Sequence, residues 1–142
     1  DLPTVALRYF NVYGPRQSGG DYAGAITAFT EQARAGDQLT VQGEGTQTRD
    51  FVNIADVVQA NLLAATTEAT GEAFNIGTGG ATTINDVAET VRDRIAPSAE
   101  ISHVDPRQGD IRDSVADIQK AETLLGYEPT VSLADGLERY LS

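Results

Sequence analysis

The sequence has no cysteine, methionine or tryptophan, and His103 is its only histidine. The lack of cysteine excludes disulfides, thiol nucleophiles and cysteine-based zinc sites, and any histidine-dependent triad would have to use His103. A lone histidine at the end of a short apolar run is more often a packed or surface side chain than a base. We therefore assign no role to His103 and no metal site to the chain.

Long apolar runs are also missing. No run approaches the ~18 residues of a membrane-spanning helix, and Asp1-Leu2-Pro3 has neither the basic region nor the apolar core of a signal sequence. We expect a soluble, cytoplasmic protein that does not bind membranes. Its 142 residues, 40% of them hydrophobic, suit one domain with a modest core.

Positive charge is scarce. Twenty-one acidic residues oppose ten basic ones, so the formal charge is −11, and Lys120 is the only lysine. This charge repels nucleic acids and anionic membranes, and neither is an expected partner. Scarce lysine beside abundant aspartate is typical of a halophile with a high-salt cytoplasm, and equally compatible with an ordinary acidic protein.

Apolar periodicity and turn residues divide the chain into alternating strands and helices. Gly36 is placed to end the first helix, the Asp56 carboxylate suits the start of the second, and Thr83 with Asp86 resembles a capping box at the third. The helix after Asp56 is largely apolar, which predicts its burial. The predicted strands cover residues 5–12, 39–41, 73–76 and 101–104, and the predicted helices cover 25–35, 57–65, 83–95, 118–125 and 132–141.

This alternation, without internal repeats or a linker, indicates the α/β class with about five helices. The strands are few, short and far apart in the sequence. They complete a larger parallel sheet more naturally than they form a whole doubly wound one, so we expect an incomplete parallel sheet.

No glycine-rich dinucleotide-binding turn follows a predicted strand. Gly43 and Gly45 lack the third glycine of that motif, and residues 77–80 lack its later spacing. No tyrosine is followed by a lysine four positions later, because Lys120 is the only lysine. A tyrosine acid/base tuned by a neighbouring lysine is therefore absent.

Three arginines lie in polar loops beside glycine or proline: Arg16, Arg49 and Arg107. Guanidinium groups that converge on a diphosphate make bidentate, charge-assisted hydrogen bonds, and such a patch attracts an anion even on an acidic protein. The competing interpretation, which spacing alone favours, is that each arginine makes a surface ion pair with a nearby aspartate.

Four segments together resemble the C-terminal half of extended short-chain dehydrogenases/reductases, and most of all UDP-glucose 4-epimerases and their relatives. They occur in the order and approximate spacing of that family, and the likeness runs from about residue 3 to residue 142. The segments are LRYFNVYGPRQ at 7–17, QTRDFV at 47–52, FNIGTG at 74–79 and RQGD at 107–110.

The resemblance implies roles for several residues. Asn11 would hydrogen-bond the substrate near its diphosphate, and Tyr9 and Phe10 would lie beside the nicotinamide of NAD. Arg49 and Arg107 would each hold a phosphate.

Two further roles concern the nucleoside. Asp110 would accept hydrogen bonds from the ribose hydroxyls. Gln42 stands where family members often have an aromatic residue over the uracil, so it would contact the base edge without stacking. The base, uracil or thymine, stays open, and the expected ligand is a UDP-sugar or a dTDP-sugar.

The same resemblance implies that the catalytic residues and the main NAD-binding turn precede Asp1. We expect residues 1–142 to be the C-terminal nucleotide-sugar-binding domain of an extended Rossmann-type enzyme, with one strand, about 4–12, that belongs to the N-terminal sheet. The chain alone is expected to be inactive. The intact enzyme, expected to be a homodimer, would be an NAD-dependent UDP-glucose/UDP-galactose 4-epimerase, or alternatively a 4,6-dehydratase or a UDP-glucuronate decarboxylase.

Two interpretations of other classes stay open. One is a freestanding, non-catalytic module that binds nucleoside diphosphates, and the other is a structural fragment without binding competence. In the second, the first strand lacks its neighbours and exposes Val5, Leu7 and Phe10, so copies of the chain would associate.

Overall fold

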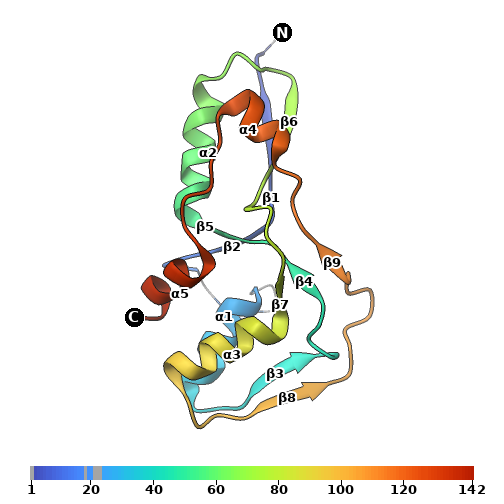
Figure 1. Ribbon diagram of the computed structural model, residues 1–142, viewed down its shortest axis with the longest axis vertical. Helices are drawn as coiled ribbons and strands as arrows, with labels where there is room; N and C mark the ends of the chain where they lie inside the picture. Colours follow the sequence, from blue (N-terminus) through green and yellow to red (C-terminus); the bar gives the residue numbers. More distant parts are fainter. Residues whose placement is uncertain (1, 18, 21–23) are drawn as a thin grey trace.

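Helices and strands alternate along the chain in the computed structural model, which describes residues 2–17, 19–20 and 24–142 (Figure 1). The predicted α/β class is confirmed, and the described residues contain five helices. The helices are α1 (Ala25–Ala35), α2 (Ile54–Thr66), α3 (Ile84–Ile95), α4 (Gln119–Leu125) and α5 (Leu133–Leu141). The strands are β1 (Val5–Tyr9), β2 (Asn11–Tyr13), β3 (Leu39–Gln42), β4 (Thr48–Arg49), β5 (Phe51–Asn53), β6 (Glu72–Ile76), β7 (Thr82–Thr83), β8 (Ile101–Val104) and β9 (Asp113–Ser114).

The strands pair into small sheets rather than one large sheet. β1 pairs with β6, β2 with β5 and β3 with β8, each in parallel. β4 lies between β7, which is antiparallel to it, and β9, which is parallel. Parallel sheets are normally larger and covered on both faces, so the two-stranded β1–β6 pair has the form of the predicted incomplete sheet.

The N-terminal apolar run forms two strands, where the sequence predicts one buried strand over residues 5–12. The backbone changes partner at its middle: the Phe10 N–H donates to the Ile76 carbonyl oxygen at 2.9 Å, and the Asn11 N–H to the Asp50 carbonyl oxygen at 3.0 Å. No residue of β1 is buried, and β6 is its one partner strand among the described residues.

α2 begins at Ile54, three residues before the predicted start at Val57. Asn53 caps the helix, because its Oδ1 accepts a hydrogen bond from the Ala55 N–H at 3.0 Å. The sequence places Asp56 just before the helix, because polar and apolar residues alternate up to Ile54. In the structure, β5 passes into α2 without a loop.

Asp56 instead lies in the first turn of α2, where it is buried. Its carboxylate accepts hydrogen bonds from the N–H groups of Thr130 and Val131, at 2.9 and 3.2 Å, and from the Thr130 hydroxyl. The residue therefore fastens α2 to the segment that leads into α5.

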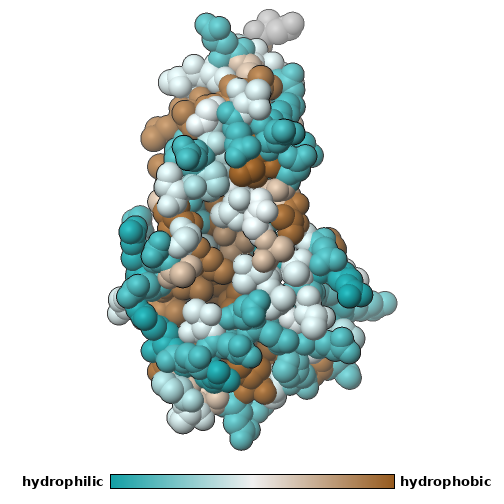
Figure 2. All heavy atoms as spheres, in the orientation of Figure 1, coloured by the Kyte–Doolittle hydropathy of each residue, from teal (hydrophilic) through white to brown (hydrophobic). Residues whose placement is uncertain are grey.

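The predicted burial of α2 holds for one side of the helix only. Val57 and Ala60 are buried, whereas Ile54, Val58 and Leu62 are 39%, 51% and 67% exposed. These three follow each other at four-residue spacing and form what we term the α2 apolar stripe; Figure 2 shows hydrophobic side chains at the surface over this helix. Across the described ranges, no helix is both long and apolar enough to cross a membrane.

The other helices begin within one residue of the predicted bounds and end at them. α1 ends at Gly36, which has φ of 79°, and α4 ends at Gly126, which has φ of 68°. Thr83 and Asp86 form the predicted capping box of α3, and the Ser132 side chain caps α5. Glycine adopts this left-handed conformation without the strain of a side chain, which explains the two stops.

Two hydrophobic cores lie in the two halves of the elongated molecule (Figure 1). One packs α1, α3 and α5 around β3, and the other packs α2 and α4 around β6. β5 joins them, because Phe51 belongs to the first core and its neighbour Val52 to the second. The residues just before β5, Arg49 and Asp50, are thereby held at the boundary between the two halves.

Candidate functional site

A β-turn brings Arg107 and Asp110 together on the connection between β8 and β9, residues 105–112, which we term the strap. The Asp110 N–H donates to the Arg107 carbonyl oxygen at 3.1 Å, and Gly109 has φ of 80°. The third position of such a turn requires a positive φ, which glycine adopts without strain. The spacing Arg107-Gln108-Gly109-Asp110 thus fixes the arginine and the carboxylate at the two ends of one turn.

β4 delivers Arg49 to the same place. β4 pairs with β9, and this pairing begins at the end of the strap: the Thr48 N–H donates to the Arg112 carbonyl oxygen at 2.8 Å, and the Asp50 N–H to the Ser114 carbonyl oxygen at 2.9 Å. Two short strands, each too short to give a periodic signal, therefore align distant parts of the sequence.

Arg49 and Asp110 form an ion pair, with Arg49 Nη2 at 2.5 Å from Asp110 Oδ1. Arg49 Nη1 also donates to the Thr48 carbonyl oxygen at 2.6 Å. Gln47 Nε2 donates to Asp110 Oδ2 at 3.3 Å and to the Gln42 carbonyl oxygen at 3.0 Å. For Arg49, pairing with a nearby aspartate is therefore what the structure shows.

The other two loop arginines differ. Within the described ranges, neither Arg16 nor Arg107 makes an ion pair. Arg107 is exposed on the strap. Arg16 has φ of 70° and borders a separate hollow of about 260 Å³ beside Tyr13 and Ile54.

Four predicted substrate residues line one hollow of about 190 Å³: Gln42, Arg49, Arg107 and Asp110. Three of these, Gln42, Arg107 and Asp110, also line an adjoining hollow of about 290 Å³. We term the two together the arginine hollow. Apolar side chains form the other wall of the smaller part: Ala25, Ala28, Phe29 and Ile84.

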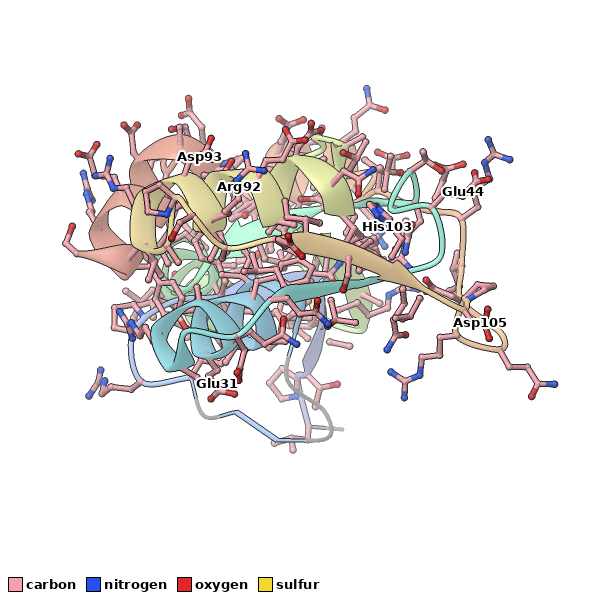
Figure 3. All side chains as sticks on the ribbon, turned by 90° about the horizontal axis from the view of Figure 1, so that it is seen from below. Glu31, Glu44, Arg92, Asp93, His103 and Asp105 are labelled. Atoms are coloured by element: carbon pink, nitrogen blue, oxygen red, sulfur yellow. The ribbon has the colours of Figure 1, made fainter. Side chains whose placement is uncertain are left out.

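Figure 3 looks at the molecule from below and shows the β3–β8 pair that leads to the hollow. Glu44, on the turn after β3, and Asp105, on the strap, lie at the same end of this pair and are both exposed. His103 Nε2 lies 3.0 Å from Asn85 Oδ1, and Asn85 Nδ2 donates to the Glu44 carbonyl oxygen at 2.9 Å. His103 thus links β8 to α3 and to this turn.

Asp50 directly follows β4, the strand that carries Arg49, and anchors it to neighbouring segments. Its fully buried carboxylate accepts hydrogen bonds from the Thr78 N–H and hydroxyl, the Gly79 N–H and the Ala116 N–H, at 2.7 to 3.2 Å. A Cβ on Gly77 would lie 2.5 Å from Asp50 Oδ2, so only glycine fits. The Thr78 and Gly79 amides of this glycine-rich turn thus bind a carboxylate of the chain itself.

The remaining predicted site residues lie elsewhere. Tyr9, Phe10 and Asn11 occupy the junction of β1 and β2, and within the described part of the chain none of them lines the arginine hollow. Tyr9 Oη donates to Asn61 Oδ1 at 3.0 Å, and Asn11 Nδ2 donates to the Asp50 carbonyl oxygen at 3.2 Å. Asn11 is therefore one hydrogen bond away from the residue that follows Arg49.

Tyr127 contacts the same glycine-rich turn that binds Asp50. Its buried hydroxyl donates to the Gly77 carbonyl oxygen at 2.8 Å. Burial, together with the nearby carboxylates of Asp56 and Asp50, raises the pKa of this phenol well above its ordinary value. Burial likewise raises the pKa of the Tyr13 phenol.

Sequence reasoning missed two residues of this arrangement, Gln47 and Asp50. Both stand in the Gln47-to-Val52 segment, but their partners lie at Asp110, Thr78 and Ala116, far away in the sequence. No local spacing encodes such contacts. The one available signal was an acidic residue placed between a site arginine and the apolar pair Phe51-Val52.

Comparison with known proteins identifies the family. Residues 1–77, more than half of the chain, match the NAD dependent epimerase/dehydratase family. A putative UDP-glucose 4-epimerase from Methanocaldococcus jannaschii is 38% identical over 136 residues, 96% of this chain and 44% of that protein. UDP-glucuronic acid decarboxylase 6 of Arabidopsis thaliana is 42% identical over 130 residues, 92% of this chain and 37% of that protein.

Comparison with solved structures identifies the same family. The crystal structure of UDP-glucose 4-epimerase with UDP-glucose from Thermotoga maritima superimposes with a TM-score of 0.93 at 42% identity, over 99% of this chain and 45% of that one. The chain thus spans less than half the length of these proteins and matches their C-terminal part. The chain belongs to the NAD dependent epimerase/dehydratase family.

Proposed function

We propose that this chain is the nucleotide-sugar-binding part of a longer NAD-dependent UDP-sugar 4-epimerase. The observation that carries the proposal is the convergence of Gln42, Arg49, Arg107 and Asp110 on one hollow. These residues come from separate stretches of the chain, and their grouping provides donors for an anion next to an apolar wall. The names of the Methanocaldococcus and Thermotoga relatives support the epimerase reaction.

The hollow suits a nucleoside diphosphate chemically. Arg107 and Arg49 would each take a phosphate through charge-assisted hydrogen bonds, and the Asp110 carboxylate, which can only accept when ionised, would take the ribose hydroxyls. The Gln42 amide would meet the base edge. We favour UDP over dTDP because the compared relatives are named for UDP-sugars.

The end of β1 is where this chain would meet the cofactor. Ligands of open α/β sheets bind beyond the carboxyl ends of the strands, and Tyr9 and Phe10 stand at that end of β1. We infer that β1 joins the dinucleotide-binding sheet of the N-terminal part and that residues 1–142 form the substrate-binding part. NAD, bound largely by that N-terminal part, supplies the hydride acceptor for the sugar, and this chain orients the sugar nucleotide.

A UDP-glucuronate decarboxylase is the second candidate, favoured by the 42% identity to the Arabidopsis enzyme. Both reactions use the same nucleotide, so the arginine hollow serves either, and a 4,6-dehydratase belongs to the same group. Full-length protein incubated with UDP-glucose or with UDP-glucuronate separates them, because an epimerase inverts the sugar C4 whereas a decarboxylase releases carbon dioxide. No turnover of any UDP-sugar would favour the non-catalytic module.

Calorimetric titration of the chain with UDP tests the binding role. Arg49→Ala and Arg107→Ala should each weaken UDP binding strongly. Arg94→Ala is the matched control, because Arg94 makes an exposed ion pair with Glu138 outside the hollow. Folded variants that bind UDP as tightly as the wild type would disprove the assignment of the two arginines.

A further inference from the structure

We propose that Asp110 is an internal competitor for the phosphate on Arg49, so that nucleotide binding exchanges one anion for another on the same guanidinium. The proposal rests on the proposed function and concerns how that site opens. Its basis is the position of the Asp110 carboxylate, 2.5 Å from Arg49 Nη2, in the hollow that both residues line.

The contacts of Arg49 define what a phosphate would meet. One terminal nitrogen, Nη1, donates to the Thr48 carbonyl oxygen, and the other, Nη2, donates to Asp110. The Arg49 side chain is 15% exposed, so few of its donors face solvent. A phosphate oxygen that takes the place of Asp110 Oδ1 on Nη2 therefore displaces the carboxylate.

The charges around the hollow favour the same exchange. With Arg49 neutralised by Asp110, Arg107 is the one arginine lining the smaller part of the hollow that makes no ion pair with the described residues. A diphosphate carries more than one negative charge and is repelled by a carboxylate at the guanidinium. Because the carboxylate is tethered through the strap, it competes at a high effective concentration.

The β-turn couples this exchange to Arg107. Asp110 and Arg107 stand at the two ends of the turn closed by the 3.1 Å hydrogen bond, so a movement of one end carries the other. Gln47 donates a hydrogen bond to Asp110 Oδ2, and this bond also changes when the carboxylate leaves Arg49. Once released from Arg49, the carboxylate is free to accept from ribose hydroxyls, so the proposed sugar contact follows from phosphate binding.

Inorganic pyrophosphate is the direct probe, because it has no ribose and reports on the arginines alone. Calorimetry should show that Asp110→Asn binds pyrophosphate about fivefold more tightly than the wild type, as expected for loss of one partly exposed ion pair. The matched control is Asp105→Asn, which removes the same charge from the same strap at an exposed residue. This control should change the affinity less than twofold.

A double-mutant cycle provides the decisive comparison. In an Arg49→Ala background, Asp110→Asn should give no gain beyond that of Asp105→Asn, with folding checked by circular dichroism for each variant. An equal effect of the two asparagine substitutions, or no pyrophosphate binding by either the wild type or Asp110→Asn, overturns the competition. If the wild type binds UDP no more tightly than pyrophosphate, the proposed nucleotide-binding function is wrong. The ratio of the pyrophosphate affinities of Asp110→Asn and the wild type still decides whether Asp110 competes for Arg49.

Discussion

Arg107 and Asp110 stand at the two ends of one β-turn, and the backbone hydrogen bond between them measures 3.1 Å. The turn depends on Gly109, whose φ of 80° places it in the left-handed region. A Cβ added there would meet no atom within 4 Å, so any effect of a larger residue is conformational rather than steric. The backbone, not packing, sets the distance between this arginine and this carboxylate.

Replacing Gly109 with alanine should weaken UDP binding about tenfold, because the strain of roughly 1–2 kcal/mol is relieved by opening the turn. Calorimetric titration measures the affinity. Gly71→Ala is the matched control, since Gly71 has φ of 78°, also meets nothing within 4 Å, and lies between α2 and β6. Equal UDP affinities for the two variants would contradict the role of the turn.

Asp50→Asn should lower the free energy of unfolding by about 3 kcal/mol. The amide replaces one acceptor oxygen by an NH₂ group that faces the N–H groups of Thr78, Gly79 and Ala116. Urea denaturation measures the loss. Asp37→Asn, at an exposed residue after α1, serves as control and should stay within about 0.5 kcal/mol of the wild type; comparable losses in both variants would argue against the buried network.

Local signals were sufficient where a feature lies within a few residues. The capping box of Thr83 and Asp86 and the stops at Gly36 and Gly126 are interactions inside one turn of helix, and they were predicted correctly. The start of α2 was not, because Asn53 ends β5 and caps the helix at the same time. One residue with two roles gives no separate signal for either.

The site was only partly predictable for a related reason. Resemblance supplied Arg49, Arg107 and Asp110, and the structure brings them together, but the ion pair between Arg49 and Asp110 depends on the two-residue strands β4 and β9. Strands of this length have no periodicity that a sequence can display. Gln47 was missed because its role exists only once the strap lies against β4.

The α2 apolar stripe should cause copies of the chain to associate. Its most exposed member is Leu62, at 67%, whereas Val5, Leu7 and Phe10, which the sequence singles out for association, are half-buried. Leu62→Lys should shift the chain toward monomer in light scattering at unchanged melting temperature. Leu124→Lys, on α4 at 48% exposure, is the control. A wild-type chain that elutes as a sharp monomer and melts cooperatively would contradict this prediction.

Alkaline pH should destabilise the chain through Tyr127. Its pKa is raised in the folded state by burial and by the carboxylates of Asp56 and Asp50, against 10.0 for the ordinary phenol. Above pH 10 the unfolded chain therefore loses a proton that the folded chain keeps, so this contribution to stability is complete below pH 10 and is lost as the pH rises further. The slope approaches ~1.4 kcal/mol per pH unit for one such group.

Tyr127→Phe separates this effect from the hydrogen bond to the Gly77 carbonyl oxygen. At pH 8 the variant should be less stable than the wild type by about 1 kcal/mol, because the bond is lost. By pH 11 the gap should narrow or reverse, because phenylalanine does not ionise when the chain unfolds. Urea denaturation at both pH values measures the gap, and a constant difference would mean that the Tyr127 phenol ionises equally in the folded and unfolded chains.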